Sequence, residues 1–173
     1  QHALYVQYNE VAPVDHDGRP LADFGQELVR TFEERRLAKV IVDVRSNGGG
    51  NNTTFPPLIR ALQSPAIDRP GVLFGLIGRS TFSAAGNFVT VLERDTKAIL
   101  MGEPTGGAPN QYGDAETVPL ANHLDVLVRI STRYHQFGKP DDPRLTHEPH
   151  LRVPLRAADY FGGRDPVLRA AVS

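Results

Sequence analysis

The amino-acid sequence predicts an α/β domain in which helices flank a mixed, largely parallel sheet. Three nearly all-apolar runs, at residues 39–44, 71–78 and 97–101, have the pattern of strands that are buried on both faces. Two stretches with helical periodicity, residues 21–37 and 83–94, alternate with these runs along the chain. Because a helix between two strands returns the chain to the edge where it started, this alternation favours parallel pairing.

The helix expected over residues 21–37 has the clearest pattern. Leu21, Phe24, Leu28 and Phe32 recur every three or four residues and form one apolar face. Glycine and proline divide the rest of the chain into shorter segments. These are a strand at 3–8, a short helix at 57–63, a long loop at 103–114, a hairpin of strands 116–120 and 124–132 that turns at 121–123, and a closing helix at 165–172.

Composition excludes several classes of protein. At 173 residues the chain is long enough for one domain with a sizeable core. A net charge of -1 gives no reason to expect nucleic acid or an anionic membrane as a partner. No apolar run approaches the roughly 20 residues of a membrane span. The absence of cysteine excludes disulfides, thiolate catalysis and thiolate metal sites.

Ser83 follows an apolar strand and precedes an amphipathic stretch. Its hydroxyl is therefore expected at a helix N-terminus, where free amides and the helix dipole stabilise negative charge. A simpler interpretation makes Ser83 or Thr81 an N-cap. The local sequence is not the G-x-S-x-G turn of the α/β hydrolases, because Thr81 and Ala85 occupy its two glycine positions.

A glycine turn at residues 47–50 directly follows the strand at 39–44. Glycine permits positive φ and lets another backbone or a substrate approach closely, although a tight exit turn alone would also use it. The turn has no P-loop pattern and no following lysine. Amides at a glycine turn and at a helix start can together face a developing oxyanion, which suggests acyl chemistry on a serine.

Four strings in this order resemble the tail-specific, or carboxy-terminal processing, serine peptidase family, particularly its tricorn-like branch. They are DVRSNGG at residues 43–49, TFSA at 81–84, MGEPTGG at 101–107 and THEPHLRVPL at 146–155. The resemblance covers about residues 40 to 155 of the chain. It implies an α/β core of the ClpP/crotonase type, a peptide or protein substrate and no cofactor, and it favours an extracytoplasmic location.

The resemblance also implies roles for individual residues. Ser83 would be the nucleophile, and the oxyanion hole would use the amide of Ala84 with one from Gly48 or Gly49. Glu148, in the last string, would be a second catalytic residue that orients the network. With this assignment the chain is a serine endopeptidase or C-terminal processing hydrolase that forms an acyl-enzyme on Ser83.

The general base is the element that the sequence does not provide. Members with a Ser-Lys dyad carry a lysine where this chain has Ala108, so that dyad is not expected. The tricorn-like branch takes a histidine from a region upstream of this core. The chain starts at Gln1, inside a strand pattern, so we expect residues 1–173 to be the C-terminal catalytic-core domain of a longer peptidase. The histidines within the chain that remain as alternatives are His2, His135 and His147.

Asn110, Gln111 and Tyr112 follow the glycine pair in the long loop. They are expected either to line a substrate cleft or to anchor a packed loop. The acidic and histidine residues between 141 and 150 match no metal-binding spacing, so no metal is expected.

Two other functions remain compatible with the sequence. The missing lysine and the unidentified base favour a catalytically silent module that binds a ligand or peptide on the same fold. A crotonase that acts on coenzyme A thioesters would share the oxyanion geometry without needing a nucleophilic serine.

Overall fold

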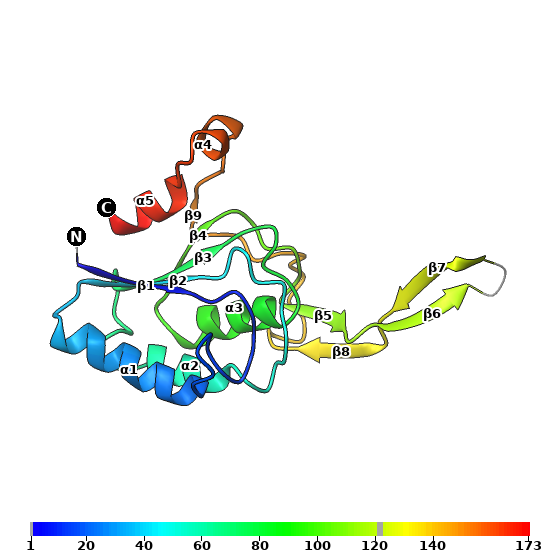
Figure 1. Ribbon diagram of the computed structural model, residues 1–173, viewed down its shortest axis with the longest axis horizontal. Helices are drawn as coiled ribbons and strands as arrows, with labels where there is room; N and C mark the ends of the chain where they lie inside the picture. Colours follow the sequence, from blue (N-terminus) through cyan, green and yellow to red (C-terminus); the bar gives the residue numbers. More distant parts are fainter. Residues whose placement is uncertain (1, 121–122) are drawn as a thin grey trace.

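The centre of the molecule is a five-stranded parallel sheet with the order β1-β2-β3-β4-β9 (Figure 1). The computed structural model describes residues 2–120 and 123–173. The sheet confirms the expected α/β class, and its strands are β1 (Ala3–Gln7), β2 (Lys39–Asp43), β3 (Leu73–Ile77), β4 (Ile99–Gly102) and β9 (Leu151–Arg152).

Apolar residues on both faces of the strands make the two halves of the core. In β2, Val40 and Val42 belong to the larger core cluster, whereas Ile41 between them belongs to the smaller one. Successive side chains of a strand point to opposite faces, so a continuous apolar run is required where both faces are covered. For this reason the continuous apolar sequence at residues 39–44 correctly predicted a central strand, β2.

Three helices cover one face of the sheet and one helix covers the other (Figure 1). The first group is α1 (Leu21–Glu34), α2 (Pro56–Leu62) and α3 (Ala84–Asp95), and the opposite face carries α5 (Pro166–Val172). The helix α1 buries Leu21, Leu28 and Phe32, as its periodicity predicts. It ends three residues before the predicted boundary, because Arg36 has a φ of 49° and no longer continues the helix.

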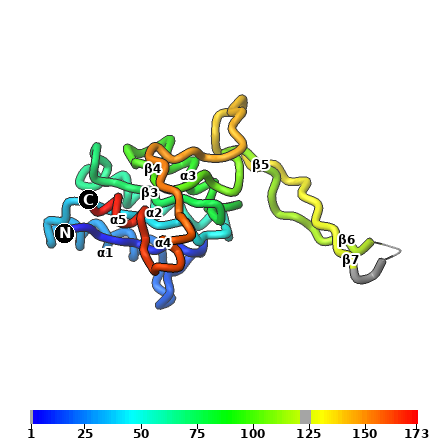
Figure 2. Tube along the Cα trace, turned by 90° about the horizontal axis from the view of Figure 1, so that it is seen from above, coloured from blue at the N-terminus to red at the C-terminus, as the bar shows by residue number. Residues whose placement is uncertain are grey.

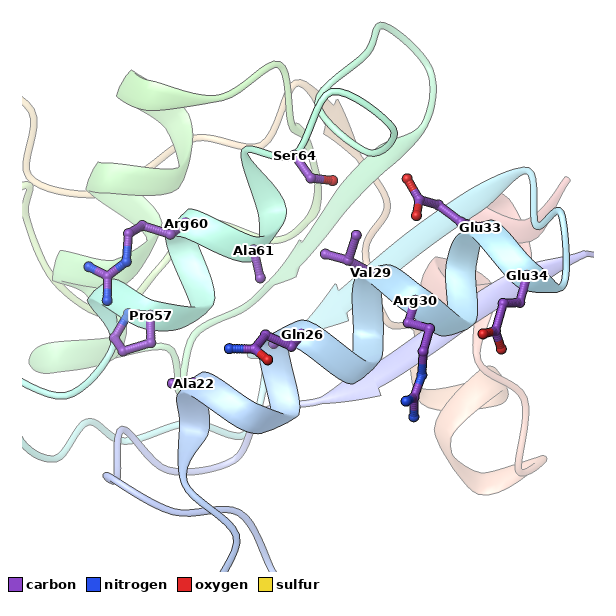
Figure 3. A pocket seen from close by; sticks show the side chains of 11 residues that line it. Ala22, Gln26, Val29, Arg30, Glu33, Glu34, Pro57, Arg60, Ala61 and Ser64 are labelled. Atoms are coloured by element: carbon purple, nitrogen blue, oxygen red, sulfur yellow. The ribbon is translucent and has the colours of Figure 1, made fainter.

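Helices α1 and α2 lie close together beneath the sheet. A Cβ added at Gly25 would lie 2.9 Å from the Cβ of Ala61, so the glycine permits this approach. Beside the contact is an open groove, lined on its two sides by Gln26 and Arg30 of α1 and by Arg60 of α2 (Figure 3). The groove shares no residue with the turn that carries Ser83.

A two-part antiparallel ribbon projects from the sheet after β4 (Figures 1 and 2). Its base pairs β5 (Asn110–Gly113) with β8 (Arg133–Gln136), and its outer part pairs β6 (Glu116–Leu120) with β7 (His123–Ile130). We call the β6–β7 part the arm. The arm confirms the predicted hairpin, although residues 121–122 of the expected turn lie outside the described residues.

Several predicted boundaries and assignments are wrong in the second half of the chain. The loop expected over residues 103–114 contains β5, and β8, β9 and the short helix α4 (Ala157–Phe161) were not predicted. Each of these elements has five residues or fewer, and the strands among them depend on partners distant in sequence. Within the described residues, no helix has the length and apolar character needed to cross a membrane.

Candidate active site

Ser83 lies in the turn between β3 and α3 with an unusual backbone conformation. Its φ is 55° and its ψ is -127°, a combination that L-residues rarely adopt. Such conformations cost about 1–3 kcal/mol and persist where the surroundings enforce them, often at functional sites. Ser83 does occupy the N-cap position of α3, as the simpler interpretation expects, but its side chain makes no capping hydrogen bond.

Thr81 has a structural role in the same turn. Its hydroxyl donates to the Val44 carbonyl at 2.8 Å and accepts from the Gly78 amide at 3.1 Å. It therefore ties the end of β3 to the end of β2, and the interpretation of Thr81 as the N-cap is wrong, because Ser83 holds that position.

The glycine turn after β2 lies against the serine turn. Gly49 has a φ of 117°, and a Cβ added there would lie 2.8 Å from the Ser83 Cβ and 3.1 Å from the Ser83 Oγ. The same Cβ would lie 3.1 Å from the Ala84 amide nitrogen. Only glycine fits this position, because both the backbone angle and the space exclude a side chain. The two turns that the sequence singled out are therefore in direct contact.

Asn47 organises the glycine turn, although its side chain was not singled out from the sequence. It is fully buried; its Nδ2 donates to the Tyr8 carbonyl at 2.8 Å, and its Oδ1 accepts from the Gly49 amide at 2.9 Å. The Gly49 N–H is thus occupied, whereas the Gly48 N–H has no acceptor within the described residues. An asparagine directly before three glycines, shortly after an apolar strand, was the sequence signal for this role.

Ala84 is the first residue of α3, so its N–H has no acceptor within the helix. The Ser83 carbonyl on the same peptide group accepts from the Asn87 amide at 3.1 Å. Within the described residues the Ala84 N–H has no hydrogen-bond acceptor, and it lies buried at the position where the Gly49 backbone approaches it. A free amide at a helix start is suited to bind an anion or oxyanion.

Arg45 joins the end of β2 to the start of α5. Its guanidinium contacts Asp43 at 2.6 Å and Asp165 at 2.7 Å, and Asp165 also caps α5 by accepting from the Leu168 amide at 2.9 Å. Burial alone would raise the pKa of Asp165, but the hydrogen bonds from Arg45 and from the Leu168 amide lower it below its usual range. The charged residues of the DVRSNGG string therefore support the fold rather than the chemistry.

The segment that carries Glu148 is tethered near the serine turn. The Gly106 amide donates to the Thr81 carbonyl at 2.9 Å, and the Thr105 hydroxyl accepts from the His147 amide at 2.8 Å. Glu148 itself is exposed and accepts from the Thr146 hydroxyl at 3.3 Å. It has no ion-pair partner within the described residues.

His147 and His135 make contacts typical of structural residues. His147 is fully buried; its Nε2 lies 2.9 Å from the Thr90 hydroxyl and its Nδ1 lies 3.4 Å from a Glu93 carboxylate oxygen. The close contact with His147 lowers the pKa of Glu93. His135 lies on the ribbon, 3.2 Å from Asp114. Among the side chains that the structure describes, those of residues 2–120 and 126–173, no histidine or lysine is hydrogen-bonded to the Ser83 hydroxyl.

Of the three residues expected in a substrate cleft, Gln111 alone reaches the serine turn. Its Nε2 donates to the Ser83 carbonyl at 3.2 Å. Asn110 bonds to the Lys139 carbonyl at 2.6 Å and the Gly138 amide at 2.9 Å, as a loop anchor would. Tyr112 is exposed and its ring packs against Tyr134 with centroids 5.2 Å apart. Alternation along β5 explains the difference, because neighbouring side chains of a strand point to opposite faces.

Comparison with solved structures shows which proteins share the fold. A candidate peptidase from Parabacteroides merdae is 19% identical, with a TM-score of 0.64 over 99% of this chain and 60% of that one. A candidate S41 protease from Bacteroides fragilis is 17% identical, with a TM-score of 0.62 over 97% and 52%. The photosystem II D1 C-terminal processing protease is 18% identical, with a TM-score of 0.57 over 86% and 41%.

These neighbours define a class of fold. The chain has the mixed α/β fold of S41 peptidases, with a mostly parallel central sheet flanked by helices. It spans 41% to 60% of the length of these three structures. No family model and no curated protein sequence matches the chain.

Proposed function

We propose that this chain is the catalytic-core domain of a serine peptidase and that Ser83 is its nucleophile. The observation that carries the proposal is the strained Ser83 turn, whose hydroxyl makes no capping bond and lies beside the backbone of Gly49. A serine held in a strained turn between a strand and a helix presents its hydroxyl beside free backbone amides. Neighbours with an S41 peptidase fold support this assignment at the level of the fold.

The reaction is an acyl transfer in two stages. The Ser83 Oγ forms a bond to the peptide carbonyl carbon, and its proton passes through a base to the amine that leaves when the C–N bond breaks. Water then attacks the acyl-enzyme, gives a proton to the same base, and releases the carboxylic acid and the serine. No cofactor is required.

The oxyanion of each tetrahedral intermediate would be held by the N–H groups of Ala84 and Gly48. Both lack an acceptor in the described part of the chain, whereas the Gly49 N–H already donates to Asn47. Gly49 has a different part in this arrangement, because its missing side chain leaves the space beside the hydroxyl open. Donors fixed by two neighbouring strand ends need no reorganisation during the reaction.

The general base would come from polypeptide outside residues 1–173, as in the tricorn-like branch that the sequence resembles. The hydrogen bonds of His135, His147 and His150 go to partners other than Ser83, which supports an external base. Exposed Glu148, tethered to the serine turn through Thr105 and Gly106, would orient that base.

A fluorophosphonate probe tests the proposal on the full-length protein. We expect the probe to label the wild type and to leave Ser83→Ala unlabelled. Ser80→Ala is the matched control, because Ser80 is exposed in the same turn and has no proposed role, and it should label as the wild type does. Labelling that survives Ser83→Ala would remove Ser83 as the nucleophile.

A catalytically silent binding module is the second candidate. The missing contact between Ser83 and any basic side chain of the described residues is the observation that favours it. It predicts that the full-length protein is not labelled at any pH and that Ser83→Ala retains a bound peptide or apolar ligand. A probe adduct on wild-type Ser83 would exclude this second function.

A further inference from the structure

The side chain of Gln111 reaches from β5 to the serine turn. Its Nε2 donates to the Ser83 carbonyl at 3.2 Å. A Cβ added at Gly107 would lie 2.5 Å from the Gln111 Oε1, and one at Gly86 would lie 3.6 Å from its Nε2. The amide group of Gln111 therefore lies between the first turn of α3 and the loop after β4, in a space that depends on glycine at position 107.

The carbonyl that Gln111 contacts belongs to the same peptide group as the Ala84 N–H. A peptide group is planar and, when trans, its C=O and N–H point in opposite directions. The described chain contains no cis peptide bond. The Ser83 carbonyl accepts from both the Asn87 amide and Gln111, so two donors fix the direction of this carbonyl. Through the rigid plane they also fix the direction of the Ala84 N–H.

The strain at Ser83 explains why a second donor matters. With φ at 55° and ψ at -127°, the residue would relax if the peptide that follows it rotated. Such a rotation would turn the Ala84 N–H away from the space beside the Ser83 hydroxyl. The bond from Gln111 opposes this rotation, since it would be lost when the carbonyl turns.

We propose that Gln111 is a positioning residue that keeps the Ala84 N–H directed at the developing oxyanion. This inference rests on the proposed peptidase function and replaces the substrate-cleft role expected from the sequence. The Gln111 amide acts through the Ser83–Ala84 peptide group and does not contact the substrate. Its effect is therefore on the chemical step and not on binding.

The test measures inactivation of the full-length protein by a fluorophosphonate, with kinact and KI determined separately. Gln111→Met keeps the size of the side chain and removes the donor, and Gln111→Glu places a second acceptor against the Ser83 carbonyl. Loss of a whole oxyanion-hole donor slows the chemical step by about 100- to 1000-fold, so a misdirected one should lower kinact by about 10- to 100-fold. We expect KI to change less than about twofold, because only ground-state contacts set it.

Gln136→Met is the matched control, because Gln136 is exposed on the partner strand β8. It should keep the wild-type kinact. Wild-type kinact in both folded Gln111 variants, or a loss confined to KI, would overturn the inference. If Gln111→Met does not fold, Gln111→Glu alone tests the inference, because it also removes the Nε2 donor to the Ser83 carbonyl.

The two proposals fail in different ways. An unlabelled wild type would overturn both the peptidase function and the role of Gln111. Labelling that requires Ser83 but is indifferent to Gln111 would leave the peptidase function in place and overturn the positioning role alone.

Discussion

The Phe82 amide donates to the Asn47 carbonyl at 3.1 Å and so joins the serine turn to the glycine turn. The Thr81 hydroxyl adds a second link between the same strand ends through its bond to the Val44 carbonyl. Because β2 and β3 are parallel neighbours, both turns leave the same edge of the sheet. The geometry around Ser83 is therefore a property of the sheet and its buried polar bonds, and mutations can test each part of it.

Asn47→Asp should destabilise the domain by about 3 kcal/mol. The new carboxylate would still accept from the Gly49 amide, but its second oxygen would face the Tyr8 carbonyl in place of the donating Nδ2. Urea denaturation measures the loss. Asn9→Asp is the control, because Asn9 is exposed in the loop that follows β1. It should leave the free energy of unfolding within about 0.5 kcal/mol of the wild type. Equal stability of the two variants would show that the Asn47 bond to Tyr8 does not matter.

Gly49→Ala and Gly48→Ala should differ sharply although they are adjacent. A methyl group at 49 would lie 2.8 Å from the Ser83 Cβ with φ at 117°, whereas a methyl group at 48 meets nothing within 4 Å. We expect Gly49→Ala to lose at least about 2 kcal/mol of stability and all probe labelling, and Gly48→Ala to keep its stability within about 0.5 kcal/mol. A Gly49→Ala variant that folds and labels normally would contradict the close contact between the two turns.

The parts of this site that depend on local pattern were predictable, and the parts that depend on backbone angle were not. The apolar run at 39–44 and the glycines after it located one side of the site, because buried strands and their exit turns have a local signature. The positive φ of Ser83 has no such signature, so an N-cap was the simpler expectation. The strand β5 was missed for a related reason, since Asn110 and Tyr112 pair with residues more than 20 positions later.

Ser83→Gly should stabilise the protein although it removes the proposed nucleophile. Glycine adopts a φ of 55° without the clash of a Cβ, so about 1 kcal/mol of strain should be recovered. Ser83→Ala keeps the Cβ and therefore most of the strain. Thermal and urea unfolding of the two variants measure the difference directly. If Ser83→Gly is no more stable than Ser83→Ala, the turn does not store strain and the argument for an enforced conformation fails.

Asp165 should make the docking of α5 sensitive to acid. Its pKa is lowered in the folded state, so its contribution to stability is complete well above its ordinary value of 3.8 and is lost as the pH falls through the lower folded value. Asp165→Asn keeps the cap of α5 but loses the ion pair with Arg45. Since the Asp165 side chain is 38% exposed, we expect a loss of only about 1 kcal/mol at pH 7.

The pH dependence of that difference is the decisive measurement. The free energies of unfolding of the wild type and Asp165→Asn should converge as the pH falls below 3.8, because the wild-type carboxyl is then becoming protonated in both states. Other acidic groups cancel in the comparison of the two proteins. A difference that stays constant from pH 7 to below pH 3 would show that the charge on Asp165 contributes nothing.

The arm should contribute little to the stability of the core. Its aliphatic residues stay largely open to solvent: Val118, Leu120, Val126, Val128 and Ile130 are between 38% and 49% exposed. A two-stranded hairpin with so little burial is at most marginally stable by itself. Replacing residues 116–130 with an Asn-Gly turn keeps β5 and β8, and with them Gln111. We expect the melting temperature to change by less than about 3 °C.

Leu100→Ala is the comparison for the arm deletion, because Leu100 is fully buried in β4. Removing this side chain should cost about 3 kcal/mol and lower the melting temperature by about 10 °C, since the surrounding core cannot close the cavity. The deletion removes many more apolar atoms than the point mutation does, but those atoms are exposed. The expected difference in melting temperature therefore follows from burial and not from the number of atoms removed. An arm deletion that destabilises the domain as much as Leu100→Ala would mean that the hairpin packs against the core in solution, contrary to its exposed position in the structure.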